Sequence, residues 1–261
     1  MARPEFDDFG RLSGFRAALA AIEREAVPKA RVLTNVDPRG FRRVGVLPGA
    51  FNPPTIAHVE LARCAKQSFN LERIFFTLSA VIVDKERLEG LLFEDRLLLL
   101  ERIADELDGA GVAIVNRGLY FEQAVAFRNL LGKDARLSFV CGMDKLVQIF
   151  DPRYYADRES ALGTLLTEAQ LLVAMRGDLG VSDLEAILRR PENEPYRDRV
   201  FPLTLPAGVR ELSSTALRRN IVEGRDIESY VPGVVAEFIA ATHAYRPGYD
   251  ARVKLIENRS L

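Results

Sequence analysis

The segment with the clearest chemical potential is Gly49-Ala50-Phe51-Asn52-Pro53-Pro54-Thr55-Ile56-Ala57-His58, which follows a short apolar run and opens a helical pattern. Gly49 permits a sharp turn, and the two prolines stiffen the loop and start the helix. Thr55 and His58 are three positions apart, so they share one side of the first helical turn. The free backbone N–H groups of a helix start bind phosphate. We therefore predict that His58 donates a hydrogen bond to a phosphate oxygen.

A second candidate segment, Glu211-Leu212-Ser213-Ser214-Thr215-Ala216-Leu217-Arg218-Arg219, lies far along the chain. Its hydroxyl residues suit the capping position of a helix, and the helix start presents further free amides. Arg218 lies one turn inside the helix, from where a forked guanidinium reaches back to the same anion. This segment predicts a second phosphate site formed by Ser213, Ser214, Thr215 and Arg218.

The middle of the chain adds three polar candidates, each at or near the end of a predicted strand. Gly142 and Asp144 follow the strand at 136–141, where Gly142 permits close approach of a ligand and Asp144 either bonds a ribose hydroxyl or caps a helix. Arg176 ends the strand at 171–175, and Lys85 follows the strand at 73–78. Lys85 contacts a substrate phosphate or stays a solvated surface residue, and both readings are open.

Together these motifs resemble the nucleotidyltransferase superfamily with the (His/Thr)-x-Gly-His signature, and within it the nicotinamide or nicotinate mononucleotide adenylyltransferases. The pattern Gly-x-Phe-x-Pro-x-(His/Thr)-x-Gly-His matches except at Ala57, where glycine is usual. Leu212 begins a segment similar to the family's Ile-Ser-Ser-Thr-x-x-Arg motif, and Val83-Asp84-Lys85 before Phe93-Glu94-Asp95-Arg96 resembles its acceptor loop. The likeness spans residues 42–243.

The resemblance implies an adenylyltransferase that uses ATP, with Mg²⁺ on the pyrophosphate. The acceptor phosphate would attack the α phosphorus in line, so that catalysis consists of positioning and charge neutralisation. Thr55, His58, Lys85 and Arg218 take the catalytic positions in that reading, without a protein-held metal. The remaining nucleotide-binding positions are Gly49, Ala50, Phe51, Asn52, Gly142, Asp144, Arg176, Ser213, Ser214 and Thr215.

The acceptor side departs from the family. Its nicotinate enzymes show Tyr-Thr-x-Asp-Thr where this chain has Tyr120-Phe121-Glu122-Gln123-Ala124, and they stack the pyridine ring on a tryptophan that this chain lacks. Phe150, Tyr154 or Tyr155 takes the place of that ring by aromatic stacking or belongs to the core, and both readings are open. The predicted acceptor-binding residues are Phe150, Tyr154 and Tyr120. Other acceptors stay open, namely phosphopantetheine, or a phosphoalcohol with CTP, as does a catalytically weak nucleotide-binding regulatory protein.

Strands and helices must position these residues. Apolar runs at 44–47, 73–78, 111–115, 136–141, 171–175 and 200–205 predict strands, and helical spacing is found at 11–26, 56–69, 93–107, 121–131, 144–150, 157–167, 181–190, 214–223 and 234–243. This alternation predicts a Rossmann-like α/β fold, a doubly wound parallel sheet with helices on both faces and a helical C-terminal segment. We expect an N-terminal helical extension over 1–40, a nucleotidyltransferase domain over 41–245 and a tail over 246–261.

Composition narrows the class of partner. The formal net charge of −1 argues against nucleic acid as the main partner, and no apolar stretch is long enough to span a membrane. Two separated cysteines, Cys64 and Cys141, indicate buried free thiols in a reducing compartment, so we expect a cytoplasmic protein. Its expected partners are ATP and a small phosphorylated acceptor, and association into a homo-oligomer is left open.

Overall fold

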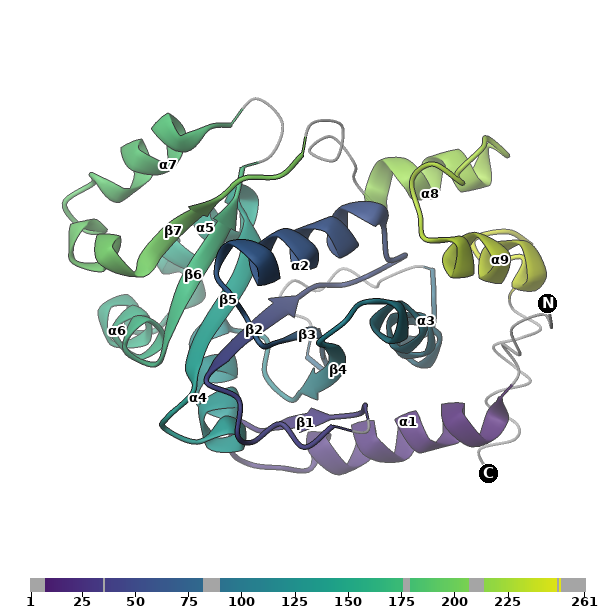
Figure 1. The fold of residues 1–261 in the computed structure, drawn as a ribbon, viewed down its shortest axis with the longest axis horizontal. Coiled ribbons are helices and arrows are strands. Elements are labelled where there is room, and N and C mark those ends of the chain that lie inside the picture. The colour runs from purple at the N-terminus through teal and green to yellow at the C-terminus, as the bar shows by residue number, and fades with distance from the viewer. Residues whose placement is uncertain are drawn as a thin grey trace.

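The protein is built on a seven-stranded sheet, seen in a computed structural model that describes residues 8–34, 36–81, 90–175, 179–206, 214–247 and 249. Its strands are β1 (Ala30–Val32), β2 (Arg43–Pro48), β3 (Arg73–Ser79), β4 (Ala110–Val115), β5 (Arg136–Gly142), β6 (Ala169–Ala174) and β7 (Val200–Leu203). They lie in the order β1-β4-β3-β2-β5-β6-β7 (Figure 1). The pairs from β4 to β7 are parallel, and β1 is antiparallel to β4.

The strand order reverses between β2 and β5. These strands are neighbours in the sheet, although Arg43 in β2 and its partner Arg136 in β5 are 93 positions apart in the sequence. From β2 the chain winds outward through β3 and β4, and it then returns to build β5, β6 and β7 on the other side. In such sheets ligands bind at the carboxyl ends of the strands next to the reversal. The loops that follow β2 and β5 therefore face the expected crevice.

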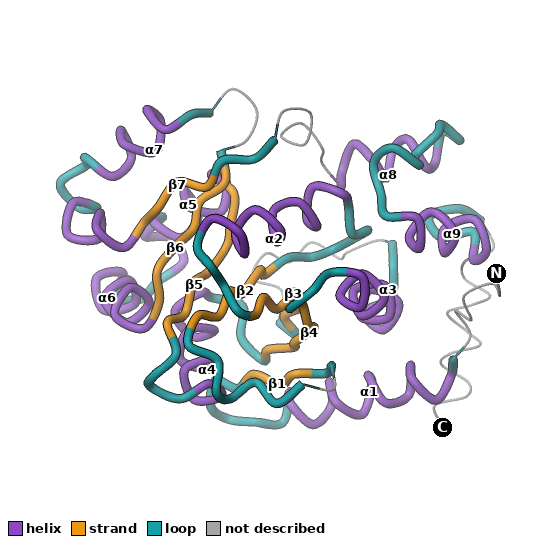
Figure 2. Tube along the Cα trace, in the orientation of Figure 1, coloured by secondary structure: helices purple, strands orange, loops and turns teal. Residues whose placement is uncertain are grey.

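Helices cover both faces of the sheet (Figure 2). One buried core draws on α1 (Phe9–Glu23), α2 (Ile56–Ser68), α3 (Phe93–Glu106), α8 (Ser214–Val222) and α9 (Gly233–Thr242). The other core draws on α4 (Tyr120–Leu131), α5 (Met143–Phe150), α6 (Arg158–Glu168) and α7 (Val181–Leu188). Two 3₁₀ helices, η1 (Pro152–Tyr154) and η2 (Glu194–Arg199), complete the described elements. The predicted doubly wound α/β class is confirmed.

Each predicted strand and helix forms, with small shifts at its ends, whereas β1 was not predicted. Three residues, Ala-Arg-Val, are too short a run to show alternation, and only pairing with β4 makes them a strand. β1 lies in the 1–40 segment, so the expected boundary at residue 40 falls within the part of the chain that forms the sheet. The antiparallel edge also departs from the expectation of a wholly parallel sheet.

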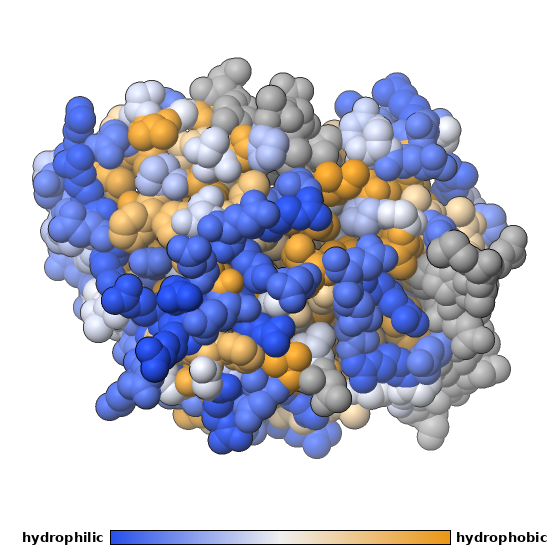
Figure 3. Space-filling model, viewed as in Figure 1, coloured by the Kyte–Doolittle hydropathy of each residue, from blue (hydrophilic) through white to orange (hydrophobic). Residues whose placement is uncertain are grey.

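The surface of this fold agrees with three-layer packing, in which helices cover both faces of the sheet. Hydrophilic side chains lie along the outer sides of α2 and α3 on the face shown in Figure 3, as expected of helices that bury their opposite side. Among the described residues, no helix has the length and apolar character that a membrane crossing requires.

Candidate active site

The loop between β2 and α2 is folded around the ring of Phe51. Phe51 adopts a positive φ of 47° and is 1% exposed, with its ring centroid 5.0 Å from that of His58 and 5.8 Å from that of Phe76. A Cβ added at Gly49 would lie 2.8 Å from Cζ of Phe51. Glycine is therefore needed at position 49 because the Phe51 ring packs against its backbone. The expected inward anchoring of Phe51 is observed.

Thr55 and His58 form a pair at the start of α2. Thr55 is the N-cap residue, and its backbone N–H donates to Nδ1 of His58 at 3.0 Å. The Thr55 hydroxyl also lies 2.8 Å from Nδ1. Because Nδ1 accepts a backbone proton, the ring proton belongs on Nε2. The pair therefore fixes the tautomer in which Nε2 of His58 is a hydrogen-bond donor.

Helix α8 reaches the same loop from the other end of the chain. Nη1 of Arg218 donates to the Asn52 carbonyl at 2.8 Å, and the Ser214 hydroxyl donates to the Pro53 carbonyl at 3.2 Å. Nη2 of Arg218 donates to Oγ1 of Thr215 at 3.2 Å. Arg218 and Asn52 are 166 positions apart in the sequence. The two segments that the sequence assigned to one triphosphate therefore meet at one loop.

Asn52 is the residue on which most of these contacts converge. It is 1% exposed, and its Oδ1 accepts from the Leu91 backbone at 3.0 Å and from the Tyr245 hydroxyl at 2.6 Å. The peptide bond between Asn52 and Pro53 is cis. Asn52 was predicted to line the nucleotide site. Its side chain is buried and fixes the loop through its hydrogen bonds with Leu91 and Tyr245. Tyr245 was not among the predicted residues, because no local pattern marks a contact 193 positions away.

The neighbouring loop supplies Gly142 and Asp144. Gly142 ends β5 and is the N-cap of α5, and Asp144 is exposed in the first turn of that helix. Gly142 ends the strand that neighbours β2 at the strand reversal, and Asp144 follows it in α5. Burial raises the pKa of the adjacent Cys141 thiol to about 12, so this thiol stays protonated and is a packing residue.

The predicted acceptor aromatics are divided between two cavities. Tyr120 and Tyr154 line a cavity of about 50 Å³ together with Gly118, Leu119, Lys145, Gln148, Ile149 and Tyr155. Phe150 instead lines a larger hollow of about 850 Å³ between α5, α6 and α7, where its ring stacks on Tyr196. The structure therefore brings Tyr120, Tyr154 and Tyr155 together and leaves Phe150 apart from them.

Tyr120 has an unusual environment. Tyr120 is 8% exposed, and its buried hydroxyl has no hydrogen-bond partner among the residues that the structure describes. Burial raises the pKa of the Tyr120 phenol well above its ordinary value, with Cys141 and Tyr155 adding to the shift. A buried hydroxyl without a partner is destabilising, and a bound group that satisfies it would remove that penalty.

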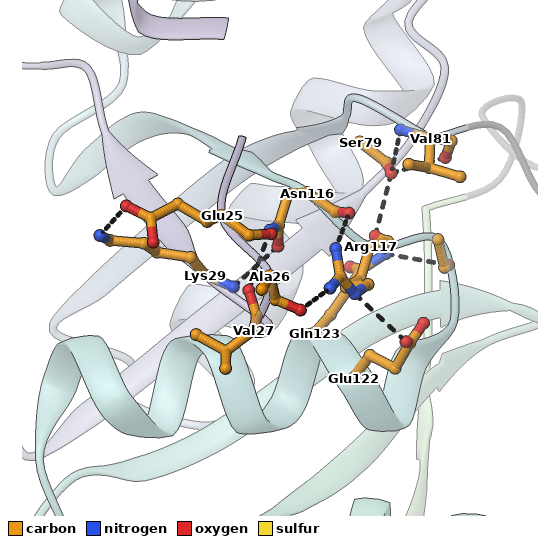
Figure 4. A network of polar contacts seen from close by, with 11 residues as sticks. Glu25, Ala26, Val27, Lys29, Ser79, Val81, Asn116, Arg117, Glu122 and Gln123 are labelled. Atoms are coloured by element: carbon orange, nitrogen blue, oxygen red, sulfur yellow. Dashed lines mark hydrogen bonds and ion pairs between the residues drawn. The ribbon is translucent and has the colours of Figure 1, made fainter. Parts of the chain in front are cut away.

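A network of hydrogen bonds joins the N-terminal segment to the loop after β4 (Figure 4). The Asn116 side chain, just past β4, accepts from the Lys29 backbone at 2.8 Å and donates to the carbonyls of Glu25 and Val27. The Arg117 guanidinium donates to the Asn116 carbonyl and pairs with Glu122. Neither residue was predicted, because no local pattern marks the hydrogen bonds that Asn116 forms with Lys29, Glu25 and Val27, or the one that Arg117 donates to the Ala26 carbonyl. The N-terminal segment is therefore bound to the loop after β4, which continues into Gly118 and Leu119 of the small cavity.

Three predicted residues, Lys85, Arg176 and Ser213, lie outside the described residues. Arg96 belongs to the segment that resembles the family's acceptor loop. Its Nη1 donates to the Ala50 carbonyl at 2.9 Å, so Arg96 contacts the loop at 49–55, which is called the nucleotide loop below. Among the described residues, no group of three or more His, Cys, Asp or Glu could hold a metal ion. Ala57 is half-buried in the first turn of α2.

The chain was compared with known proteins. It is 25% identical to a protein of Clostridium beijerinckii named "Probable nicotinate-nucleotide adenylyltransferase", over 79% of this chain and 100% of that protein. It is 26% identical to a protein of the same name from Moorella thermoacetica, over 80% of this chain and 94% of that protein. The fold is similar to that of Plasmodium falciparum nicotinic acid mononucleotide adenylyltransferase complexed with NaAD, with a TM-score of 0.60 at 15% identity, over 78% of this chain and 97% of that chain.

The sequence model of one family, described as cytidylyltransferase-like, matches residues 46–220. This stretch begins in β2 and ends in α8, so it contains the loop at 49–58 and the segment at 214–218 that meets it. The predicted resemblance and the predicted class of enzyme are confirmed. The chain belongs to the cytidylyltransferase-like family and is a nucleotidyltransferase.

Proposed function

We propose that the protein transfers AMP from ATP to nicotinate mononucleotide or nicotinamide mononucleotide and releases pyrophosphate. The observation that carries this proposal is the convergence of the Thr55–His58 pair and Arg218 on the loop at 49–55. The names of the relatives support a pyridine mononucleotide as the acceptor. So does the NaAD in the Plasmodium structure, which is the dinucleotide that such a reaction would form.

The reaction needs no general base. The acceptor phosphate is ionised at neutral pH, and one of its oxygens forms a bond to the α phosphorus while the bond to the bridging oxygen breaks. The electron pair of that broken bond leaves on pyrophosphate. Nε2–H of His58 would donate to an oxygen on which this charge develops, and Arg218 would neutralise the leaving phosphates.

Magnesium enters this proposal as part of the substrate MgATP. The nucleotide oxygens and water supply most of the ligands that this ion prefers. The described residues contain no cluster that would hold it independently, so we assign no protein metal site.

The departures on the acceptor side favour a broad acceptor test. Purified protein would be supplied with ATP or CTP and with nicotinate mononucleotide, nicotinamide mononucleotide, phosphopantetheine or a phosphoalcohol, and pyrophosphate release would be measured. We expect release with ATP and one of the pyridine mononucleotides. Release only with another pair would assign the other acceptor. ATP binding without release on any acceptor would identify a nucleotide-binding regulatory protein and refute the proposal.

A further inference from the structure

A buried cation lies directly behind the nucleotide loop. Arg96, in the first turn of α3, is 7% exposed, and its Nη1 donates a hydrogen bond to the Ala50 carbonyl at 2.9 Å. Its Nε is buried without a hydrogen-bond partner in the described part of the chain. None of the ion pairs formed by the described residues includes Arg96. The charge is therefore largely removed from water, and no carboxylate of the described residues lies within ion-pairing distance of it.

Such a charge is unfavourable in the protein alone. Burying a guanidinium without an ion pair destabilises a fold, and an apolar side chain of similar volume is often more stable there. Burial lowers the pKa of Arg96, while the nearby Glu94 and the hydroxyls of Tyr245 and Tyr249 favour the charged form. Arginine nevertheless remains protonated in proteins. An anion bound on the other side of the loop would offset the penalty.

The loop geometry gives Arg96 a route to that anion. In a trans peptide the N–H points opposite to the C=O, and the peptide that joins Ala50 to Phe51 is not cis. Holding the Ala50 carbonyl toward Arg96 therefore turns the Phe51 N–H away from Arg96. Arg218 holds the Asn52 carbonyl in the same loop. Two guanidinium groups thus fix two carbonyls of one phosphate-binding loop.

We propose that Arg96 is a positioning residue for the polyphosphate of the nucleotide, acting through the Ala50 carbonyl and through its own unneutralised charge. This inference rests on the proposed function, in which the loop binds ATP. A purely structural Arg96 would support the loop without regard to the charge of the ligand. A positioning cation must instead strengthen binding in proportion to the charge of the ligand.

Four variants of the full chain separate the two roles. Arg96→Gln removes the charge, Arg96→Lys retains it, and Tyr245→Phe removes an uncharged hydrogen bond to the same loop. Arg39→Gln removes an exposed arginine near the opposite end of β2 and is the control for net charge. Calorimetric binding of ATP, AMP and adenosine would be measured with each, together with the free energy of unfolding in the absence of ligand.

We expect Arg96→Gln to weaken ATP binding about tenfold or more, AMP binding less and adenosine binding little, because a charge acts on charge. Its unfolding free energy should stay unchanged or rise. Arg96→Lys should retain most of the ATP affinity, and Tyr245→Phe should change ATP and adenosine binding in equal proportion. Arg39→Gln should leave all three affinities unchanged.

An opposite change provides an independent test that leaves Arg96 in place. Glu94, 7% exposed, is the carboxylate whose charge favours the protonated form of Arg96, and its own ion pair is with Arg16. Glu94→Gln should raise ATP affinity a few-fold and leave adenosine binding unchanged. This variant decides the question even if Arg96→Gln does not fold.

Equal losses for ATP and adenosine in Arg96→Gln, or unchanged ATP affinity, would overturn the inference, as would unchanged ATP affinity in Glu94→Gln. Failure of the unmodified protein to bind ATP would overturn both the inference and the proposed function. If the protein binds ATP with the expected charge dependence but releases no pyrophosphate, the role of Arg96 is supported and the proposed reaction is refuted.

Discussion

The predicted nucleotide side, around the loop at 49–55, and the predicted acceptor side, around Tyr120, are built in different ways. On the nucleotide side, Asn52 alone receives hydrogen bonds from Leu91, Arg218 and Tyr245, which come from three separate parts of the chain. On the acceptor side, the cavity beside Tyr120 measures about 50 Å³, and the Tyr120 hydroxyl has no partner in the described region. The loop around Asn52 is held by several hydrogen bonds, whereas the surroundings of Tyr120 leave a buried hydroxyl unpaired among the described residues.

Under the proposed function, this difference predicts that specificity depends on the acceptor side. A triphosphate presents the same charges in every reaction of this kind, so a fixed loop serves it well. An acceptor cavity with an unsatisfied hydroxyl favours the ligand that supplies the missing hydrogen bond. The following experiments test whether the two sides can be changed independently.

The largest effect should follow the loss of His58 on the nucleotide side. His58→Ala removes the donor that the Thr55 backbone orients, and the loss of one such donor costs about a hundredfold to a thousandfold in turnover. Pyrophosphate release and circular dichroism would be measured together. Turnover equal to that of the unmodified protein would exclude His58 from the reaction, and a lost fold would show that its role is structural.

The next effect concerns Asn116, which joins the N-terminal segment to the loop after β4. Asn116→Ala removes three hydrogen bonds to the N-terminal segment and leaves buried backbone groups unpaired, so the free energy of unfolding should fall by about 2–4 kcal/mol. Urea unfolding measures this change. If the two sides are independent, the KM for ATP should remain constant while the KM for the acceptor rises. A parallel rise in both values would contradict the distinction.

Arg218→Lys tests the nucleotide side with the charge retained. Lysine cannot hold the Asn52 carbonyl and a phosphate with one planar fork, so kcat/KM for ATP should fall about tenfold. Steady-state kinetics with varied ATP measures the loss, and Arg219→Lys, in the next position of α8, is the matched control. Equal values for both variants would remove Arg218 from the site.

Alkaline pH should lower the free energy of unfolding through Cys141. Its folded pKa is raised to about 12 from an ordinary value of 9.0, so above pH 9 the unfolded chain releases a proton that the folded protein retains. Stability is therefore unaffected below pH 9 and falls as the pH rises toward 12, by at most about 1.4 kcal/mol per unit. Urea unfolding at pH 8 and pH 10 in reducing buffer tests this, and Cys141→Ala should reduce the dependence. An unchanged dependence in that variant would assign it to other groups.

The smallest effect should come from Tyr120→Phe. Removing a buried hydroxyl without a partner should raise the free energy of unfolding by about 1 kcal/mol. If the hydroxyl binds the acceptor, the KM for the acceptor should rise at the same time while the KM for ATP stays constant. Greater stability without any change in the acceptor KM would show that this hydroxyl plays no part in acceptor binding.

The alternating strands and helices could be predicted from the sequence, because buried parallel strands and amphipathic helices have clear patterns over many residues. The strand at 73–79 and the helix at 93–106 are examples, since each carries a continuous apolar run or stripe. The three residues of β1 carry no such pattern. Their strand character depends on pairing with β4, which only tertiary structure reveals.

The candidate site residues show the same contrast between local sequence motifs and long-range contacts. Thr55, His58 and Arg218 belong to compact local motifs, and their meeting could be anticipated because both motifs open helices that bind anions. Tyr245 and Arg96 contact the same loop through single long-range hydrogen bonds, which no spacing in the sequence encodes. Phe150 and Tyr154 are only four positions apart, yet their side chains line different cavities, because the chain turns at η1. The sequence does not show this turn, so the two residues could not be assigned to different cavities in advance.

The bond between Tyr245 and Asn52 has a consequence for the synthesis of the protein. The loop at 49–55 leaves the ribosome early, yet the hydroxyl that completes the surroundings of Asn52 belongs to a residue made almost two hundred positions later. Tyr249, which donates to Asp95 and accepts from the Leu92 backbone, emerges later still. A nascent chain that has already formed β2 and α2 therefore still holds an unfinished nucleotide loop, and ribosome-bound fragments ending before residue 245 should bind ATP more weakly than the released protein.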